Sequence, residues 1–439
     1  MEKTLLFIQG IYDTIDLFVE ALSGAFRQMG CTCYQIDIRD EASAMLQLKK
    51  RIEEGSIDAI ITFNNIGYNL SFFEGKNIWE EQEIPYINIL MDHPFHYAYP
   101  LMHAPKTSVV FCTDRNHMAF LRRFYPHLKR VDFMPHAGME ADISEYAKAG
   151  RCHLCQQGDA YHLSMEERPI DVLYAGGLSK YVAEGLVPDL GAIREFDAFE
   201  LAQEALADLI QHPSKTTEAA VEGYLRSIGK QYTDKELNHW ITELRFIDSY
   251  ATSFYREQSV RLLVEHGVRV TVFGGGWDRC EWADHPNLIY GGKVLAPQVL
   301  ELMNHAKIVL NTMTWYKNGI HDRIINGMLA KAAVVTDMSE YLEEALPGHM
   351  LISSEACVPG DHIEEMNSKT YAPVGSRSKT APCLAAFSLP QIQELPELVQ
   401  NLLDHPEQME EIARNGYRYA KAHHTWKQRA EYIYEKYLK

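Results

Sequence analysis

Short apolar runs alternate with stretches of helical periodicity through the first 140 residues. We expect buried strands at 5–8, 33–38, 57–63, 87–91, 109–112 and 131–134, with helices at 42–54 and 114–124. Another helix is predicted where apolar residues recur three or four positions apart, at Leu17, Phe18, Ala21, Leu22, Ala25, Phe26 and Met29. Asp13 or Thr14 is suited to cap its start, and Gly30 to end it. Repeated β–α–β order predicts a parallel sheet with helices on both faces.

The alternation stops after residue 137 and begins again near residue 170. The intervening stretch, 138–168, has no strong period and is interpreted as a linker. Further strands are predicted at 170–175, 268–273, 287–290, 308–311, 333–336 and 384–387, and helices at 249–266, 297–306, 321–331, 339–346 and 391–403. A polar, helix-prone segment at 182–250 indicates a helical insertion, and 354–382 indicates a long loop. The fold class expected is α/β, with two Rossmann-like lobes whose parallel sheets face a cleft.

The predicted organisation has four parts. Residues 1–140 form a first lobe, 141–168 a linker, 169–405 a second lobe that carries the insertion, and 406–439 the terminal helices. In the last of these parts Thr425 and Gln428 have the spacing of a capping box. Because the helix that follows has one apolar face, we expect it to cover another surface, which can belong to the first lobe.

Charge and composition narrow the classes of function. The formal net charge is −18, which argues against a non-specific nucleic-acid binder, because such proteins need a basic face. No run of about 18 apolar residues indicates a membrane span, and the opening MEKTLLFIQG has too few apolar residues for a signal peptide. Eight scattered cysteines suit a reducing compartment. We therefore expect a cytoplasmic protein.

Three glycine turns follow predicted strands, at Gly10, at Gly176-Gly177 and at Gly274-Gly275-Gly276-Trp277. Glycine allows a phosphate to approach the backbone, and a helix that follows supplies N–H groups. None of the turns has the GxGxxG or GxxxxGKS spacing, so a nicotinamide or P-loop enzyme is disfavoured. Each turn taken alone is also compatible with an ordinary tight turn.

Polar residues gather at the start of the predicted helix at 321–331. Arg323 can bind a phosphate oxygen in a charge-assisted hydrogen bond, and His321 can do the same or donate to a sugar hydroxyl. Alternatively, Arg323 pairs with Asp322 and has only a structural role.

The second half of the chain resembles the CgeB-like (spore-maturation protein) glycosyltransferases, relatives of the large group-1 glycosyltransferase family. The stretches that carry the resemblance are VTVFGGGWD, NLIYGGKVLAPQVLELMNHAKIVLNT, HDRIINGMLAKAAVVTD and LLDHPEQMEEIARNGYRYAKAHHTWKQRAEYI. They lie in residues 268–336 and 384–433, and the insertion is not covered. The resemblance implies a bacterial-type enzyme of the GT-B fold that needs no metal and no cofactor. It also implies that the second lobe holds a nucleotide diphosphate-sugar.

The same resemblance implies a set of donor-binding residues. Gly292, Lys293 and Val294 would lie by the nucleobase, and Asn311 and Tyr316 would flank the donor. Arg323 would contact the diphosphate above Gly176 and Gly177. The remaining donor-side candidates are Gly275, Gly276, Trp277, His321 and Asn326. This chain departs from its relatives at Asn326 and Asn318, where many of them carry acids. An asparagine can still accept and donate hydrogen bonds, but it loses a charge-assisted one.

The first lobe is expected to supply the acceptor side. An inverting transfer needs a base, and Asp92, His93 and His136 follow predicted strands. Each can instead be a turn or capping residue, and a retaining transfer needs no base. Cys152 and Cys155, with His153 and His162 nearby, offer only one half of a usual zinc pattern, so no metal site is predicted.

The function expected is transfer of a sugar from a nucleotide diphosphate-sugar to a glycan, protein or small molecule. An alternative is a non-catalytic relative that binds a sugar nucleotide or serves as a scaffold. A dinucleotide-dependent enzyme is a third alternative, disfavoured by the missing fingerprint.

Overall fold

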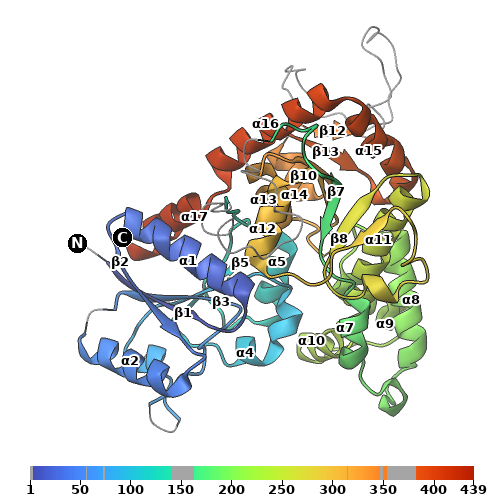
Figure 1. The fold of residues 1–439 in the computed structure, drawn as a ribbon. Coiled ribbons are helices and arrows are strands. Elements are labelled where there is room, and N and C mark those ends of the chain that lie inside the picture. The colour runs from blue at the N-terminus through green and yellow to red at the C-terminus, as the bar shows by residue number, and fades with distance from the viewer. Residues whose placement is uncertain are drawn as a thin grey trace.

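The computed structural model of the protein describes residues 3–55, 57–72, 75–140, 163–313, 315–346, 350–352 and 382–439. Two lobes, each built around a parallel sheet, lie side by side (Figure 1). Cys152, Cys155, His153 and His162 lie outside the described residues, as does nearly all of the loop predicted at 354–382. No helix within the described ranges is both long and apolar enough to cross a membrane.

The sheet of the first lobe has six parallel strands in the described residues, in the order β2-β1-β3-β4-β5-β6. The strands are β1 Thr4–Gln9, β2 Thr32–Asp37, β3 Ala59–Phe63, β4 Tyr86–Leu90, β5 Ser108–Cys112 and β6 Val131–Phe133. The helices are α1 Asp13–Gln28, α2 Glu41–Glu53, α3 Ile78–Glu81, α4 Ala98–Met102 and α5 Arg115–Phe124. Every residue of β3, β4 and β5 is buried, as expected for a parallel sheet covered on both faces.

The sheet of the second lobe has seven described strands, in the order β12-β13-β11-β10-β7-β8-β9. They are β7 Ile170–Ala175, β8 Val270–Phe273, β9 Leu288–Tyr290, β10 Ala306–Asn311, β11 Ala333–Asp337, β12 Met350–Ile352 and β13 Leu384–Phe387. The main helices are α11 Phe246–Glu265, α12 Ala296–Asn304, α13 Asp322–Leu329, α14 Glu340–Ala345 and α15 Leu395–Asp404. The sequence did not predict β12. The predicted fold class, α/β with two lobes that are each built on a parallel sheet, is confirmed.

The strand order changes direction between β1 and β3 in the first lobe, and between β7 and β10 in the second. Ligands of open α/β sheets bind beyond the carboxyl ends of strands at such points. In the second lobe this place is marked by Gly176 after β7 and by Asn311 at the end of β10. The topology alone therefore locates the candidate site.

The helical insertion follows β7 in the sequence but packs on the first lobe. Its helices are α7 Lys180–Ala183, α8 Ala198–Gln211, α9 Thr217–Ser227 and α10 Asp234–Glu243. Leu201, Val221 and Ile241 of the insertion share one buried apolar core with Phe120 and Phe124 of α5. Figure 1 shows α10 below the first lobe's α5, at the junction of the two lobes. The insertion therefore joins the lobes through an apolar core.

The C-terminal helices form a second connection. Helix α16, Pro406–His423, packs against α13, and α17, Trp426–Ile433, lies along α1 (Figure 1). The Trp426 ring is buried between Phe18 and Phe63, with ring centroids 5.3 Å and 5.8 Å away. Thr425 and Gln428 form the predicted capping box.

Candidate active site

Two glycine turns touch at the mouth of the second sheet. The Gly176 N–H donates to the Phe273 carbonyl at 2.8 Å, and the Leu178 N–H donates to the Gly275 carbonyl at 2.9 Å. A Cβ placed on Gly274 would lie 2.5 Å from the backbone nitrogen of Gly177, a distance that no side chain tolerates. Gly274 also has a φ of 126°, which favours glycine. Glycine is therefore required here by close backbone approach.

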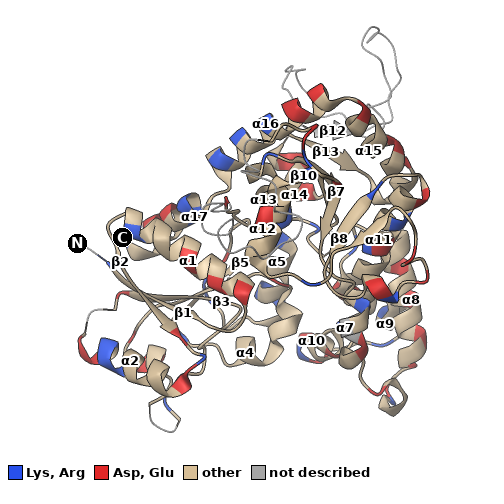
Figure 2. Ribbon diagram, viewed as in Figure 1, with Lys and Arg blue, Asp and Glu red and all other residues tan. Residues whose placement is uncertain are grey.

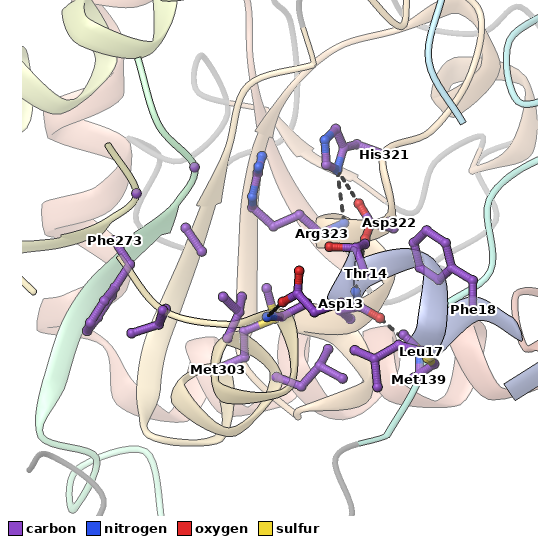
Figure 3. Close-up of a pocket in the computed structure, with 18 residues that line it drawn as sticks. Asp13, Thr14, Leu17, Phe18, Met139, Phe273, Met303, His321, Asp322 and Arg323 are labelled. Atoms are coloured by element: carbon purple, nitrogen blue, oxygen red, sulfur yellow. Dashed lines mark hydrogen bonds and ion pairs between the residues drawn. The ribbon is translucent and has the colours of Figure 1, made fainter. Parts of the chain in front are cut away.

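A cavity of about 330 Å³ lies between the lobes at this point. The second lobe contributes the two glycine turns, the start of α13 and one face of α12, and the first lobe contributes the start of α1. Its polar lining residues are Asp13, Thr14, His321, Asp322, Arg323 and Asn326 (Figure 3). A second cavity, of about 520 Å³, lies across the glycine turns and is lined by residues that include Gly177, Tyr181, Arg256, Gly275, Tyr290 and Lys293.

Arg323 lies in the first cavity, where its side chain is held from below. It is 7% exposed, and its Nη1 donates to Asn311 Oδ1 at 2.5 Å. Its guanidinium carbon lies 5.3 Å from the centre of the Tyr174 ring. Burial lowers the pKa of Arg323, but a guanidinium stays protonated in proteins. No carboxylate of the described residues forms an ion pair with it, so the alternative in which Arg323 pairs with Asp322 is not supported.

Arg256 is a second buried cation at the same turns, and the sequence did not point to it. It lies in α11, is 6% exposed, and donates from Nη1 to the Gly177 carbonyl at 2.7 Å. After burial and the opposing effect of Tyr174, the Arg256 charge contributes to lowering the pKa of Arg323. As with Arg323, no ion pair to Arg256 occurs within the parts of the chain that are described, and its Nε has no hydrogen-bond partner there. Helix α11 is buried on most of its faces, so the sequence shows no separate polar face that would have pointed to Arg256 as a site residue.

Both carboxylate oxygens of Asp322 contact neighbouring side chains. Its Oδ1 lies 2.6 Å from His321 Nδ1, and its Oδ2 accepts from Asn326 Nδ2 at 3.3 Å. Burial opposes ionisation, but His321, His136 and Arg323 together hold the pKa of Asp322 below its ordinary value. Asp322 therefore stays ionised, and its charge partly offsets that of Arg323 although the two form no ion pair.

The buried arginines at the glycine turns contrast with the acidic balance of the chain as a whole. Figure 2 shows acidic residues spread along the outer helices of both lobes, in keeping with 60 acidic against 42 basic residues. The cations at the glycine turns are thus a feature of the site.

Most of the predicted donor-side residues lie together, in one cavity or the other. Gly176, Val294, His321, Arg323 and Asn326 line the first. The second is lined by Gly177, Gly275, Gly276 and Lys293. Gly292 lines neither described cavity.

Three predicted donor ligands instead support the site from beneath. Asn311 is fully buried and holds Arg323, while its Nδ2 donates to Thr336 Oγ1 at 3.0 Å. Trp277 is fully buried, and its Nε1 donates to the Gly176 carbonyl at 2.8 Å. Tyr316 donates its hydroxyl hydrogen to the Met91 carbonyl of the first lobe and is buried. Each is therefore corrected from a donor contact to a positioning residue.

None of the three predicted bases lines either cavity. His93 is buried, and its Nδ1 accepts from the Phe95 N–H at 3.2 Å, which gives it a capping role. His136 Nε2 lies 3.1 Å from the Tyr316 hydroxyl, and burial lowers its pKa to about 4. Both histidines are thus neutral groups of the core.

Asp92 lies at the carboxyl end of β4, outside the cavities. Its Oδ2 accepts from the Tyr97 hydroxyl at 2.7 Å and from Asn64 Nδ2 at 3.2 Å. Asn64 has a left-handed backbone, with φ of 49°. These hydrogen bonds orient Asp92 beyond the carboxyl end of β4, next to the residue that follows β3.

Asn326, the position at which relatives carry an acid, contacts backbone from the end of the first lobe. Its Oδ1 accepts from the Met139 N–H at 2.9 Å. Asn318 likewise faces the first lobe, because its N–H donates to Asp114 Oδ2 at 2.7 Å. Both asparagines therefore take part in contacts between the lobes. Across the described residues, no group of three or more histidine, cysteine or acidic side chains is arranged to hold a metal ion.

Residues 256–368 and 384–435 match the model of a family described as Glycosyl transferase-like. The match begins at Arg256 and includes α12, α13 and the C-terminal helices. The later part of the second lobe is therefore glycosyltransferase-like. The match does not extend to the first lobe or to the insertion. No curated protein matches the chain.

Several solved structures share the general layout. Sucrose-phosphate synthase from Thermosynechococcus elongatus is 10% identical, with a TM-score of 0.48, over 100% of this chain and 98% of that one. Anabaena Alr3699/HepE in complex with UDP and glucose is 10% identical, with a TM-score of 0.43, over 99% of each chain. An alpha-glucosyltransferase in complex with UDP and a 13-mer DNA is 9% identical, with a TM-score of 0.48, over 100% of each chain.

Proposed function

We propose that the protein transfers a sugar from a nucleotide diphosphate-sugar to an acceptor, with the diphosphate held between Arg323 and Arg256. The observation that carries this proposal is the pair of buried guanidinium groups at the glycine turns, neither of which has an ion-pair partner among the described residues. The family match of the same lobe supports it.

A buried cation without a counter-ion is costly, because it has lost its water without gaining an opposite charge. Two such cations repel each other, and a ligand with two adjacent negative groups relieves both costs. A diphosphate has this chemistry. It also fits the two glycine turns, where the backbone can approach a phosphate closely.

The same arrangement favours departure of the diphosphate. As the bond from the sugar to the phosphate breaks, negative charge grows on the leaving oxygen, and fixed cations stabilise that charge. In this proposal the two arginines serve without a metal. Walls from both lobes line the cavity, so that a bound donor would be shielded from part of the solvent, which would limit its hydrolysis. An acceptor would approach from the first lobe, where Asp92 is oriented.

The test compares nucleotide binding by two arginine variants. Arg323→Ala is expected to weaken binding of nucleoside diphosphates by about 10- to 100-fold, the worth of one hydrogen bond to a charged group. Binding of the matching nucleosides should change much less. Arg168→Ala is the matched control, because Arg168 is also buried in this lobe but donates to the Ala306 and Ala330 carbonyls. Titration calorimetry with uridine, guanosine and adenosine diphosphates measures both. Equal weakening for nucleoside and diphosphate would contradict the assignment.

A non-catalytic sugar-nucleotide binder is the second candidate, favoured by Asn326 and its hydrogen bond to the Met139 backbone. Donor hydrolysis distinguishes the two functions. Slow release of the free sugar from a bound donor indicates an enzyme. Tight binding without any release, with acceptors of each class present, indicates a binder.

A further inference from the structure

Asp13 caps a helix of the other lobe. It is the first residue of α1, whose own N-cap is Tyr12 and has no side-chain cap. Asp13 Oδ2 instead accepts the backbone N–H of Ala296 at 2.5 Å. Ala296 is the first residue of α12 and follows closely on the loop that contains Lys293 and Val294. The prediction that Asp13 or Thr14 caps the start of α1 is therefore wrong.

The same carboxylate lines the first cavity, which also contains Arg323. Figure 3 shows Asp13 and Thr14 near the middle of the pocket, with Arg323, Asp322 and His321 above them. Asp322 is the other carboxylate in the lining, and both of its oxygens are engaged. Asp13 has one oxygen, Oδ1, without a hydrogen-bond partner in the described residues.

The charge of Asp13 restricts what can lie against it. A phosphate would be repelled, whereas a hydroxyl group can donate to a carboxylate in a charge-assisted bond. A ligand with its diphosphate at Arg323 must therefore turn a neutral, hydroxyl-bearing part towards Asp13. In a nucleotide sugar the two such parts are the ribose and the sugar.

We propose that Asp13 is a specificity-determining residue that accepts a hydroxyl hydrogen bond from the sugar of the donor. The sugar is assigned because Asp13 comes from the first lobe, the side from which the acceptor must reach the sugar. This inference depends on the proposed function. Oδ2 of the same carboxylate caps α12 of the second lobe. Asp13 therefore binds the sugar only when the two lobes have the relative position that allows this cap.

The experiment separates the capping role from the sugar contact. Asp13→Asn keeps an oxygen that can accept the Ala296 N–H but removes the charge. The control is Asp16→Asn, the same change at a position three residues further along α1. Asp16 accepts the Gly10 N–H at 2.7 Å and lies outside the cavity. Titration calorimetry measures the affinities of UDP-glucose, GDP-mannose and ADP-glucose and of the corresponding free nucleoside diphosphates. The variants are then compared with the pair that the wild-type protein binds.

We expect Asp13→Asn to weaken binding of the nucleotide sugar by about tenfold, the worth of a charge-assisted hydrogen bond, while binding of the diphosphate stays within about twofold. Asp16→Asn should change neither. A purely capping Asp13 would leave the ratio of the two affinities unchanged, and this result would overturn the inference while leaving the proposed function intact. If the wild-type protein binds no nucleotide sugar and no diphosphate, both proposals fail.

Discussion

Replacing Arg256 with methionine should separate a ligand-binding arginine from a structural one. Methionine fills similar space without charge. The change removes one hydrogen bond, from Nη1 to the Gly177 carbonyl, which is worth about 1.5–3 kcal/mol for a charged donor. It also removes a buried charge without an ion-pair partner in the described residues and its repulsion with Arg323. Replacing a buried ion pair by apolar groups often stabilises a protein by about 1–4 kcal/mol, and removing a buried charge without a partner is expected to gain at least as much. The unliganded protein should thus lose at most about 2 kcal/mol, and can gain about as much.

Diphosphate binding, by contrast, should weaken in Arg256→Met whatever the change in the stability of the unliganded protein. At a diphosphate concentration 100 times the wild-type Kd, binding stabilises the native state by about 2.7 kcal/mol. A tenfold weaker complex would contribute only about 1.4 kcal/mol at the same concentration. Thermal unfolding with and without the diphosphate measures both effects.

The control for this prediction is Arg429→Met. Arg429 is equally buried, but it donates to the carbonyls of Pro135, His423 and His136. Its loss leaves several buried acceptors unpaired, so this variant should be strongly destabilised without ligand. If Arg256→Met behaved like Arg429→Met and kept the full stabilisation by diphosphate, the assignment of Arg256 would be refuted.

Two further predictions concern stability. Trp426→Ala should lower the free energy of unfolding by about 3–5 kcal/mol in urea titrations. Trp426→Phe should lower it far less, because the indole N–H that it removes has no hydrogen-bond partner in the buried core. A loss under about 1 kcal/mol for the alanine variant would contradict the packing described. Burial lowers the pKa of both His136 and His117 to about 4 from 6.5, so their contribution to stability is complete above about pH 6.5 and is lost as the pH falls through 4. Each histidine can contribute up to about 3 kcal/mol to the free energy of unfolding. Between pH 7.5 and 4.5 the melting temperature of His117→Phe should therefore fall less steeply than that of the wild-type protein. An unchanged slope would refute the conclusion that His117 is buried in its neutral form.

The sequence predicted most strands at the right places along the chain, because most buried strands are apolar runs followed by a glycine or a polar turn. It also located Arg323, since polar residues cluster at the start of α13 ahead of an apolar strand. The sequence did not predict β12, Met350–Ile352.

The rest of the site depends on tertiary contacts. Arg256 lies in a helix buried on most of its faces, so no polar face marked it. Asp13 has the right spacing to cap its own helix, and only the fold brings it to α12. Asn311 and Tyr316 follow a strand end, as ligands often do, but their side chains turn inward to hold Arg323 and the Met91 carbonyl. Which way such a side chain points is decided by packing.

The insertion that shares an apolar core with α5 has a consequence for unfolding. Its helices belong to the second lobe by chain order and to the first by packing. Separating the lobes would expose side chains such as Leu201 and Phe120 to water, so neither lobe can melt while the other keeps all of its own interior. We therefore expect a calorimetric scan to show one cooperative transition for both sheets, with the insertion as the element that merges two folding units into one.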